Sequence, residues 1–234
     1  MMKFMRRVCV AAVLAALSFS AVRTEVFYGS TKLKKQEFDT VTVNGSLQFE
    51  EIKVSSLTVN GAVKGKDSAL GAVTVNGSFD VKDCSSDGLT VNGYTEISDV
   101  KVEGAVTVNG RLSAKDSKMK RLSVAANIVS LDDCVVDGDI LIRPAQGFSG
   151  GATTSWIPSW IGTTVRKTTN WVASWFSSSE QAVDEEDEES DMQKLYLKGD
   201  TKVTGSISFE SGNGIIIKSA KATLTGSVTG GEIR

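Results

Sequence analysis

The sequence predicts an all-β protein built as a parallel β-helix, or β-solenoid, of short 16–21-residue coils that an insertion interrupts. Three observations predict this fold. The tetrapeptide Thr-Val-Asn-Gly occurs at 42–45, 58–61, 74–77, 90–93 and 107–110, in steps of 16, 16, 16 and 17 residues. Apolar and polar residues alternate around each copy, which is the two-residue period of a half-buried strand. A related apolar-x-Gly-x-apolar pattern returns near the end of the chain. Fixed-length repeats of this kind are the signature of a solenoid.

Residues 1–21 have the pattern of a signal peptide for export. A basic segment with three cations precedes an apolar run over 8–17, which is short for a membrane span. Small residues follow this run, and we expect cleavage after Ser20. The alternative is that the segment is retained as an N-terminal anchor.

The solenoid repeats are predicted over 41–143, after a lead-in or N-terminal cap over 22–40. Each unit contains three short strands, and Asn-Gly makes the turn after the first, because glycine tolerates left-handed backbone. One inward stack is predicted to consist of Val43, Val59, Val75, Val91, Val108 and Val124. Asn-Gly between alternating runs is also typical of hairpins, so the competing fold is an antiparallel meander. A meander does not require the same residue at the same place in every repeat, whereas a solenoid does.

Residues 144–193 lack the repeat and are predicted to be a partly disordered insertion with a Trp-rich half and an acidic half. The candidate contact residues are Trp156, Trp160, Trp171, Trp175 and Phe176. Clustered tryptophans suit a membrane interface or a partner groove. Equally, they suit a cover that folds back onto the solenoid. The acidic run 184–191 holds seven carboxylates in eight residues and is predicted to be a disordered linker.

The solenoid pattern resumes over 194–234 with longer coils, giving eight or nine coils in all. Val203 and Ile207 flank a Thr-Gly-Ser that recurs 21 residues later, and Leu195–Leu197 is matched to Ile215–Ile217 at a step of 20. This apolar-x-Gly-x-apolar recurrence resembles the bactofilins. The resemblance implies a right-handed β-helix that forms polymers and has no catalytic residues. The export signal and the insertion differ from that family, whose members are typically cytoplasmic and uninterrupted.

A column of acids recurs at one position of successive coils, and it consists of Glu51, Asp67, Asp83, Asp99, Asp116 and Asp132. Stacked carboxylates suit Ca²⁺, but the Ca²⁺-binding nonapeptide repeat is absent. The favoured interpretation is therefore a turn, in which Asp accepts local backbone hydrogen bonds.

The threonines and asparagines of the repeat form two parallel ladders. Hydroxyl ladders are typical of ice-binding solenoids, but those present two threonine ranks, whereas the second rank here is asparagine. Strand propensity and stacked amide hydrogen bonds account for both ranks without a ligand.

Two cysteines, Cys84 and Cys134, follow the signal peptide. The solenoid places them three coils apart, about 14 Å along the axis. A disulfide requires Cα atoms within about 7 Å, so we predict that the two are not bonded within one chain.

Composition excludes several kinds of chemistry. The 234 residues contain no histidine, which removes the commonest general base and metal ligand, and the net charge of −2 gives no reason to expect nucleic acid. We therefore predict no enzyme activity, no metal and no cofactor.

The predicted function is that of an exported bacterial structural protein of the periplasm or cell envelope, which forms a homo-oligomer or polymer. The alternative is a secreted or surface adhesin or effector that binds a membrane or protein partner through the Trp-rich insertion.

Overall fold

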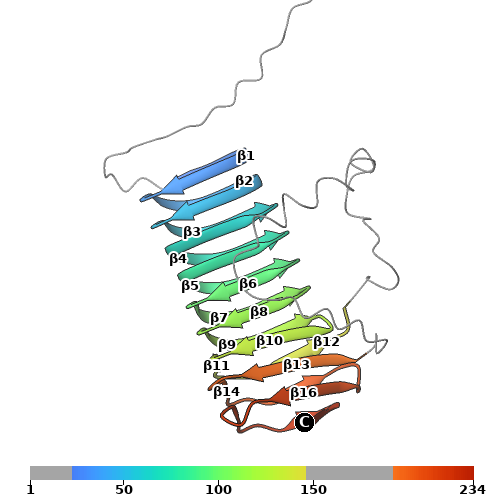
Figure 1. The fold of residues 1–234 in the computed structure, drawn as a ribbon. Helices are drawn as coiled ribbons and strands as arrows, with labels where there is room; N and C mark the ends of the chain where they lie inside the picture. The colour runs from blue at the N-terminus through green and yellow to red at the C-terminus, as the bar shows by residue number, and fades with distance from the viewer. Residues whose placement is uncertain (1–22, 146–191) are drawn as a thin grey trace, which may run out of the picture. The chain divides into compact units, whose positions relative to one another are not determined.

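The computed structural model describes residues 23–145 and 192–234, and each regular element in those ranges is a β-strand (Figure 1). The strands are β1 (Thr24–Lys34), β2 (Glu37–Glu50), β3 (Lys53–Asn60), β4 (Val63–Asn76), β5 (Phe79–Asn92), β6 (Thr95–Ser98), β7 (Lys101–Asn109), β8 (Leu112–Lys115), β9 (Lys118–Ala125), β10 (Ile128–Asp132), β11 (Val135–Val136), β12 (Ile140–Arg143), β13 (Gln193–Lys198), β14 (Lys202–Val203), β15 (Ile207–Phe209), β16 (Gly214–Lys218), β17 (Thr223–Leu224), β18 (Val228–Thr229) and β19 (Gly231–Ile233). They form one 19-stranded sheet in which the pairings are parallel. The predicted all-β parallel solenoid is confirmed, and the antiparallel meander is excluded.

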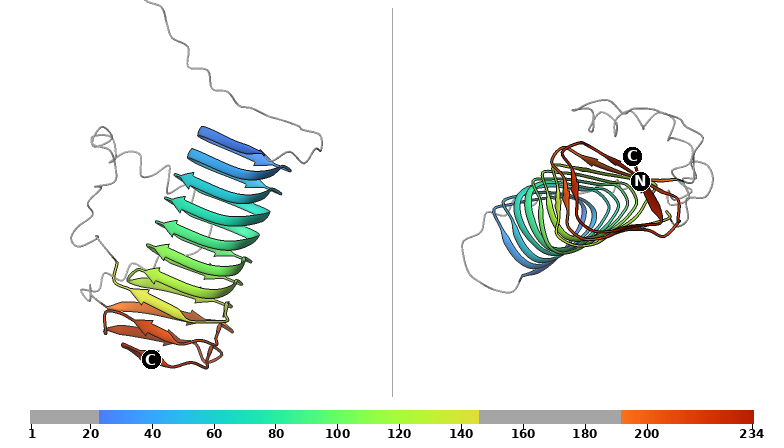
Figure 2. Two further views of the ribbon diagram at one scale, coloured as in Figure 1. Left: turned by 180° about the vertical axis from the view of Figure 1, so that it is seen from behind. Right: turned by 90° about the horizontal axis from the view of Figure 1, so that it is seen from below.

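The solenoid has about 10 turns, more than the eight or nine that the sequence predicts. Part of the difference is the segment predicted as a lead-in. Its strand β1 pairs with β2 at eleven successive positions, from Thr24 with Thr40 to Lys34 with Glu50. The lead-in is therefore itself a turn of the same stack, and the turns lie on one another when viewed from below (Figure 2, right).

The core consists of inward-facing columns that run through successive turns. The predicted valine stack is confirmed, because its six members are fully buried and are register neighbours one turn apart. A second buried column lies two residues earlier in the same strands and consists of Val41, Leu57, Val73, Leu89, Val106 and Leu122. Each turn buries its apolar side chains only against its neighbours, as expected of a solenoid.

In the turns that contain Asn-Gly, this corner requires glycine. Gly45, Gly61, Gly77 and Gly93 have φ between 145° and 149°, a region that L side chains rarely adopt. A Cβ at each position would also overlap the carbonyl oxygen of the glycine one turn earlier. The identical tetrapeptides therefore reflect a corner where successive backbones stack in close contact.

The stack continues across the insertion. Strand β12 ends at Arg143 and β13 begins at Gln193, so the insertion leaves the solenoid at the position that Asn-Gly occupies in earlier turns. Val129 of β10 pairs with Leu195 of β13, and Ile140 of β12 pairs with Ile207 of β15. The turns before and after the insertion therefore form one continuous sheet.

The C-terminal register differs by one residue from the prediction. Val203 pairs with Leu224 and Ile207 with Val228, which confirms the 21-residue step. Leu195, however, pairs with Ile216, so the predicted match with Ile215 is wrong. At the start of β16, Gly214 lies against the ring of Phe209, where a Cβ would overlap the ring.

Candidate functional site

The tryptophan cluster lies outside the described residues. Trp156, Trp160, Trp171, Trp175 and Phe176 all fall between 146 and 191, as does the acidic run 184–191. The signal-peptide prediction over 1–21 also falls on residues that the structure does not describe. Within 23–145 and 192–234, no helix has the length and hydropathy needed to cross a membrane.

One surface of the solenoid carries the ladders that the repeat predicts. Its outward residues come from the strand segment just before the Asn-Gly corner, and five turns contribute three residues each. We call this surface the ladder face, and its members are Thr40, Thr42, Asn44, Ser56, Thr58, Asn60, Ala72, Thr74, Asn76, Gly88, Thr90, Asn92, Ala105, Thr107 and Asn109.

The asparagines of the ladder face form a continuous chain of hydrogen bonds. The Nδ2 of Asn60 donates to Oδ1 of Asn44 at 2.8 Å, and the Nδ2 of Asn76 donates to Oδ1 of Asn60 at 2.8 Å. The next two bonds, from Asn92 to Asn76 and from Asn109 to Asn92, measure 2.7 and 2.6 Å. All four bonds run in the same direction along the stack, and the five amides remain exposed. The predicted amide stacking is therefore confirmed, and each amide keeps hydrogen-bonding capacity toward solvent.

The ladder face is uncharged, whereas the other surfaces of the turns carry ion pairs. The strands after the Asn-Gly corner hold Lys64 and Asp80 at 3.2 Å, and the third strands hold Lys53 and Glu37 at 2.9 Å. In the described ranges, no ion pair includes a ladder-face residue. Of these surfaces of the turns, the ladder face is therefore the one without charged side chains.

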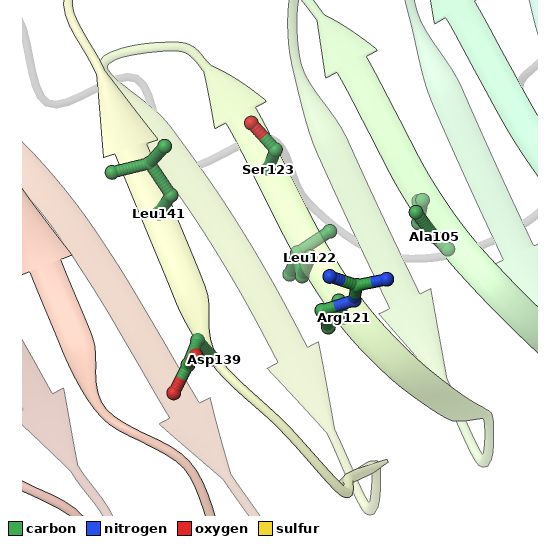
Figure 3. Close-up of a pocket in the computed structure, with 7 residues that line it drawn as sticks. Ala105, Arg121, Leu122, Ser123, Asp139 and Leu141 are labelled. Carbon is green, nitrogen blue, oxygen red and sulfur yellow. The ribbon is translucent and has the colours of Figure 1, made fainter.

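The two ends of the ladder face differ in relief. At the N-terminal end, Val26 and Tyr28 of β1 continue the threonine and asparagine columns and are 52% and 79% exposed. At the other end, Ala125 continues the asparagine column and is buried. Beside it is an open hollow of about 300 Å³, and the side chains around it are those of Ala105, Val106, Arg121, Leu122, Ser123, Asp139 and Leu141 (Figure 3).

The acidic column forms a corner of each turn. Glu51, Asp67, Asp83 and Asp99 have φ between 51° and 54°, so each adopts the left-handed conformation that aspartate tolerates better than most residues. The predicted turn is confirmed, but in the described ranges no backbone N–H donates to the carboxylates of these four residues. Among the described residues, no group of three or more acids or thiols has an arrangement that would hold a metal ion.

The last member of the acidic column is predicted one residue too early. Asp133 has the left-handed φ of 50°, whereas Asp132 is the final residue of β10 and pairs with Lys115. The preceding Asn-Gly corner is replaced there by Ala125-Ala126-Asn127, and four residues instead of three separate the inward residues on either side of it. The corner without glycine therefore contains one extra residue.

Two lysines pair with Glu50, the residue just before this corner. The Nζ atoms of Lys34 and Lys66 lie 2.8 and 3.1 Å from the carboxylate of Glu50. Their hydrogen bonds and charges lower the pKa of Glu50, with Lys34 the larger cause. Because these groups are exposed, the pairs contribute little to stability individually.

Both described cysteines are free, as predicted, and both are buried. Each thiol lies just after the left-handed corner: Cys84 Sγ donates to the carbonyl of Lys82 at 3.1 Å, and Cys134 Sγ donates to that of Asp132 at 3.2 Å. Burial raises the pKa of each thiol to about 11. In other turns a serine occupies the same position, such as Ser68, whose Oγ donates to the carbonyl of Lys66 at 2.7 Å. The cysteines are therefore part of the corner structure, which the sequence did not indicate.

The two ends of the described stack expose core-facing side chains. Within the described residues, β1 pairs only with β2, and β17, β18 and β19 pair only with β14, β15 and β16. Ile233 continues the inward column of Ile216 but is 51% exposed, and Phe27 continues that of Val43 but is half-buried.

Comparison of the chain with family models, curated proteins and solved structures gives no match.

Proposed function

We propose that the protein is an exported, non-enzymatic structural protein of a bacterial cell envelope whose β-helix associates with itself end to end. The observation that carries the proposal is the exposure of core-facing side chains and unpaired strand edges at both ends of the described stack. An open strand edge is a template for pairing with another chain, and stacking a second solenoid on it covers both features. The bactofilin-like repeat supports a polymer, and the signal-peptide pattern supports export.

The C-terminal end is apolar. The last inward residues of the stack are Leu224, Val228 and Ile233, and none of them is buried to the extent of its equivalents one turn earlier. Another turn placed on this end would remove these side chains from water, which is favourable by roughly 25 cal/mol per Å². This end therefore supplies the driving force that we propose for assembly.

The N-terminal end is mixed. Phe27, Thr31 and Leu33 face inward, but Glu25 occupies the column of Val41. A carboxylate at a core position disfavours burial, and inward-pointing charges are one way in which proteins protect an open edge. We therefore infer that Glu25 limits stacking on this end, and that the length of the assemblies depends on it.

The test is the size of the assemblies formed by the mature chain, beginning after Ser20. We expect concentration-dependent assembly in sedimentation velocity and linear particles in negative-stain micrographs. Ile233→Lys should abolish assembly, because it places a charge in the exposed apolar end. The matched control Thr229→Lys, which alters an exposed outward residue of the same turn, should assemble normally. Glu25→Val should lengthen the particles. A strictly monomeric chain that none of these changes affects would refute the proposal.

A second candidate function is binding of a membrane or protein partner through the Trp-rich insertion. The observation that favours an accessory role is the continuous pairing across the insertion, since β10 pairs with β13 without it. Deleting 145–192 leaves four residues between Ile142 and Leu195, the same number that separates Val124 from Val129 in the corner without glycine. The deleted chain should keep its β-sheet circular dichroism and lose flotation with liposomes. Loss of folding would instead mean that the insertion is a structural cover.

A further inference from the structure

The ladder face lacks charge over five turns, in a chain where 23% of the residues are charged. Its strands lie between corners and surfaces that hold lysines, aspartates and glutamates, so the absence of charge is local to this face. Depletion of charged residues is the compositional feature of the centre of protein interfaces, where tyrosine is enriched. Tyr28, in line with the asparagine column, adds that aromatic side chain.

The ladder face is complementary to itself. Hydroxyl and amide groups each donate and accept hydrogen bonds, so a column of threonines or asparagines can bond to an identical column. The rows of the face repeat at the strand spacing of about 4.8 Å, and a second copy has the same spacing. Every row of one copy can therefore meet a row of the other in register, which a surface with a different repeat cannot achieve.

We propose that two copies of the chain pair side by side through their ladder faces, with their solenoids antiparallel and with Thr74 and Asn76 at the centre. The proposal rests on the self-association proposed above and adds a second, lateral contact to it. A twofold axis along the strand direction keeps each column opposite the same column and reverses the order of the rows. Such an interface is isologous, the commonest kind in homo-oligomers.

The relief at the two ends of the face fits this arrangement. With the row of Thr74 at the centre, the row of Val26 and Tyr28 meets the row of Ser123 and Ala125 in the second copy. The exposed ring of Tyr28 then meets the short side chain of Ala125, next to Arg143 of the following turn, whose Nη2 donates to Ser123 Oγ at 2.9 Å. Val26 meets the hollow beside Ser123. One twofold axis thus places Tyr28 and Val26 of each copy against Ala125 and the hollow of the other copy.

The size of the face sets the expected strength of pairing. The contact has seven rows about 4.8 Å apart, the five of the ladder face and one beyond each end, and each row has five residues about 3.3 Å apart, which gives roughly 34 by 16 Å. Two such faces cover on the order of 1,100 Å², at the lower limit of specific interfaces. Isolated pairs should therefore be weak. Copies that are already stacked end to end present many ladder faces at once, and their pairing is strengthened by multivalency.

Thiol cross-linking of the full mature chain tests the arrangement. Asn76→Cys lies at the proposed centre and should link to itself through a short bis-maleimide, whereas Glu96→Cys, exposed on the neighbouring surface, should not. Asn44→Cys should fail to link to itself and should link to Asn109→Cys when the two variants are mixed. The native thiols do not interfere, because Cys84 and Cys134 are buried. If Asn76→Cys links no better than Glu96→Cys, the proposal is wrong.

A charge at the centre gives a second measurement that separates lateral from end-to-end contact. Asn76→Lys places two like charges opposite each other and should weaken pairing about tenfold or more, whereas Glu96→Lys should leave it unchanged. In micrographs, Asn76→Lys should narrow the linear particles without shortening them, and Ile233→Lys should leave no linear particles. Assemblies of unchanged width would overturn the lateral contact and leave the end-to-end contact standing. If the ladder face does not cross-link but the protein binds insoluble cellulose, the face is a carbohydrate-binding surface. This result would also overturn the lateral contact.

Discussion

The ring of Phe49 occupies the space that a side chain at Gly65 would fill. The two residues are register neighbours in one inward column, and a Cβ built on Gly65 would overlap the Cε2 and Cζ atoms of Phe49. The smallest residue of the column thus lies next to its largest one, as close packing requires. Gly214 likewise lies against the ring of Phe209, but there the two residues flank one corner and are not register neighbours.

Gly65→Ala should therefore lower the free energy of unfolding by about 1–3 kcal/mol, the usual effect of overpacking a core. The matched control is Gly88→Ala, because a Cβ at Gly88 has its nearest contact at 3.8 Å, to the carbonyl oxygen of Ala105. That control should change stability by less than about 0.5 kcal/mol. Urea unfolding of both variants and of Gly65→Ala with Phe49→Leu measures the coupling between the two sites. Additive effects in the double variant would contradict the steric explanation.

Thr95 is the unfavourable member of another core column. It lies between Phe79 and Leu112, it is fully buried, and its Oγ1 has no hydrogen-bond partner among the described residues. Thr95→Val keeps the shape and removes the unsatisfied hydroxyl, so the free energy of unfolding should rise by about 1 kcal/mol. Thr90→Val on the ladder face serves as the control and should have little effect. A loss of stability in Thr95→Val would mean that a bound water satisfies the hydroxyl.

The inward columns were predictable from the sequence, because a repeat of constant length places equivalent residues one above the other. Val75 is an example: its position in the tetrapeptide was enough to predict its burial. The Asn ladder followed from the same reasoning. The absence of charge from the ladder face can also be predicted from the outward positions of the repeats, since these hold threonine, serine, asparagine, alanine or glycine.

The errors arose where a corner changes length. Consecutive aspartates at 132 and 133 and consecutive isoleucines at 215–217 fit either register, so alternation alone does not choose between them. The register is seen only in the pairing between turns, such as that of Leu195 with Ile216 and of Asp132 with Lys115. The hollow beside Ser123 was not predictable either, since it depends on residues of three successive turns.

The left-handed corner gives a prediction that separates backbone conformation from charge. Asp99 has a φ of 54° and only weak exposed contacts, at 3.2 Å to Ser98 and 4.0 Å to Lys82. Asp99→Asn retains tolerance of this conformation and should change the free energy of unfolding by less than about 0.5 kcal/mol. Asp99→Val should lower it by roughly 1–2 kcal/mol, because β-branched residues are strained at positive φ. Equal losses in the two variants would show that the carboxylate, and not the backbone, is what the corner requires.

The buried thiols make stability depend on pH above neutrality. Cys84 and Cys134 have pKa values of about 11 in the folded chain, raised by burial, whereas an unfolded cysteine ionises near pH 8.5. Between these limits the unfolded chain binds fewer protons than the folded one. The free energy of unfolding must then fall as pH rises, by up to about 1.4 kcal/mol per pH unit for each thiol.

Urea unfolding between pH 8 and 10 measures this dependence. The control is Cys84→Ala combined with Cys134→Ala, which should flatten it. Tyr94, whose pKa is raised to about 12 mainly by burial, ionises in the unfolded chain near pH 10 and so has little effect over most of this range. Iodoacetamide at pH 8 should modify neither thiol until the chain is unfolded, because the reactive thiolate is suppressed and the sulfurs are covered. Rapid modification of either cysteine in the folded protein would show that its corner opens locally, and the pH dependence assigned to that residue would then be lost.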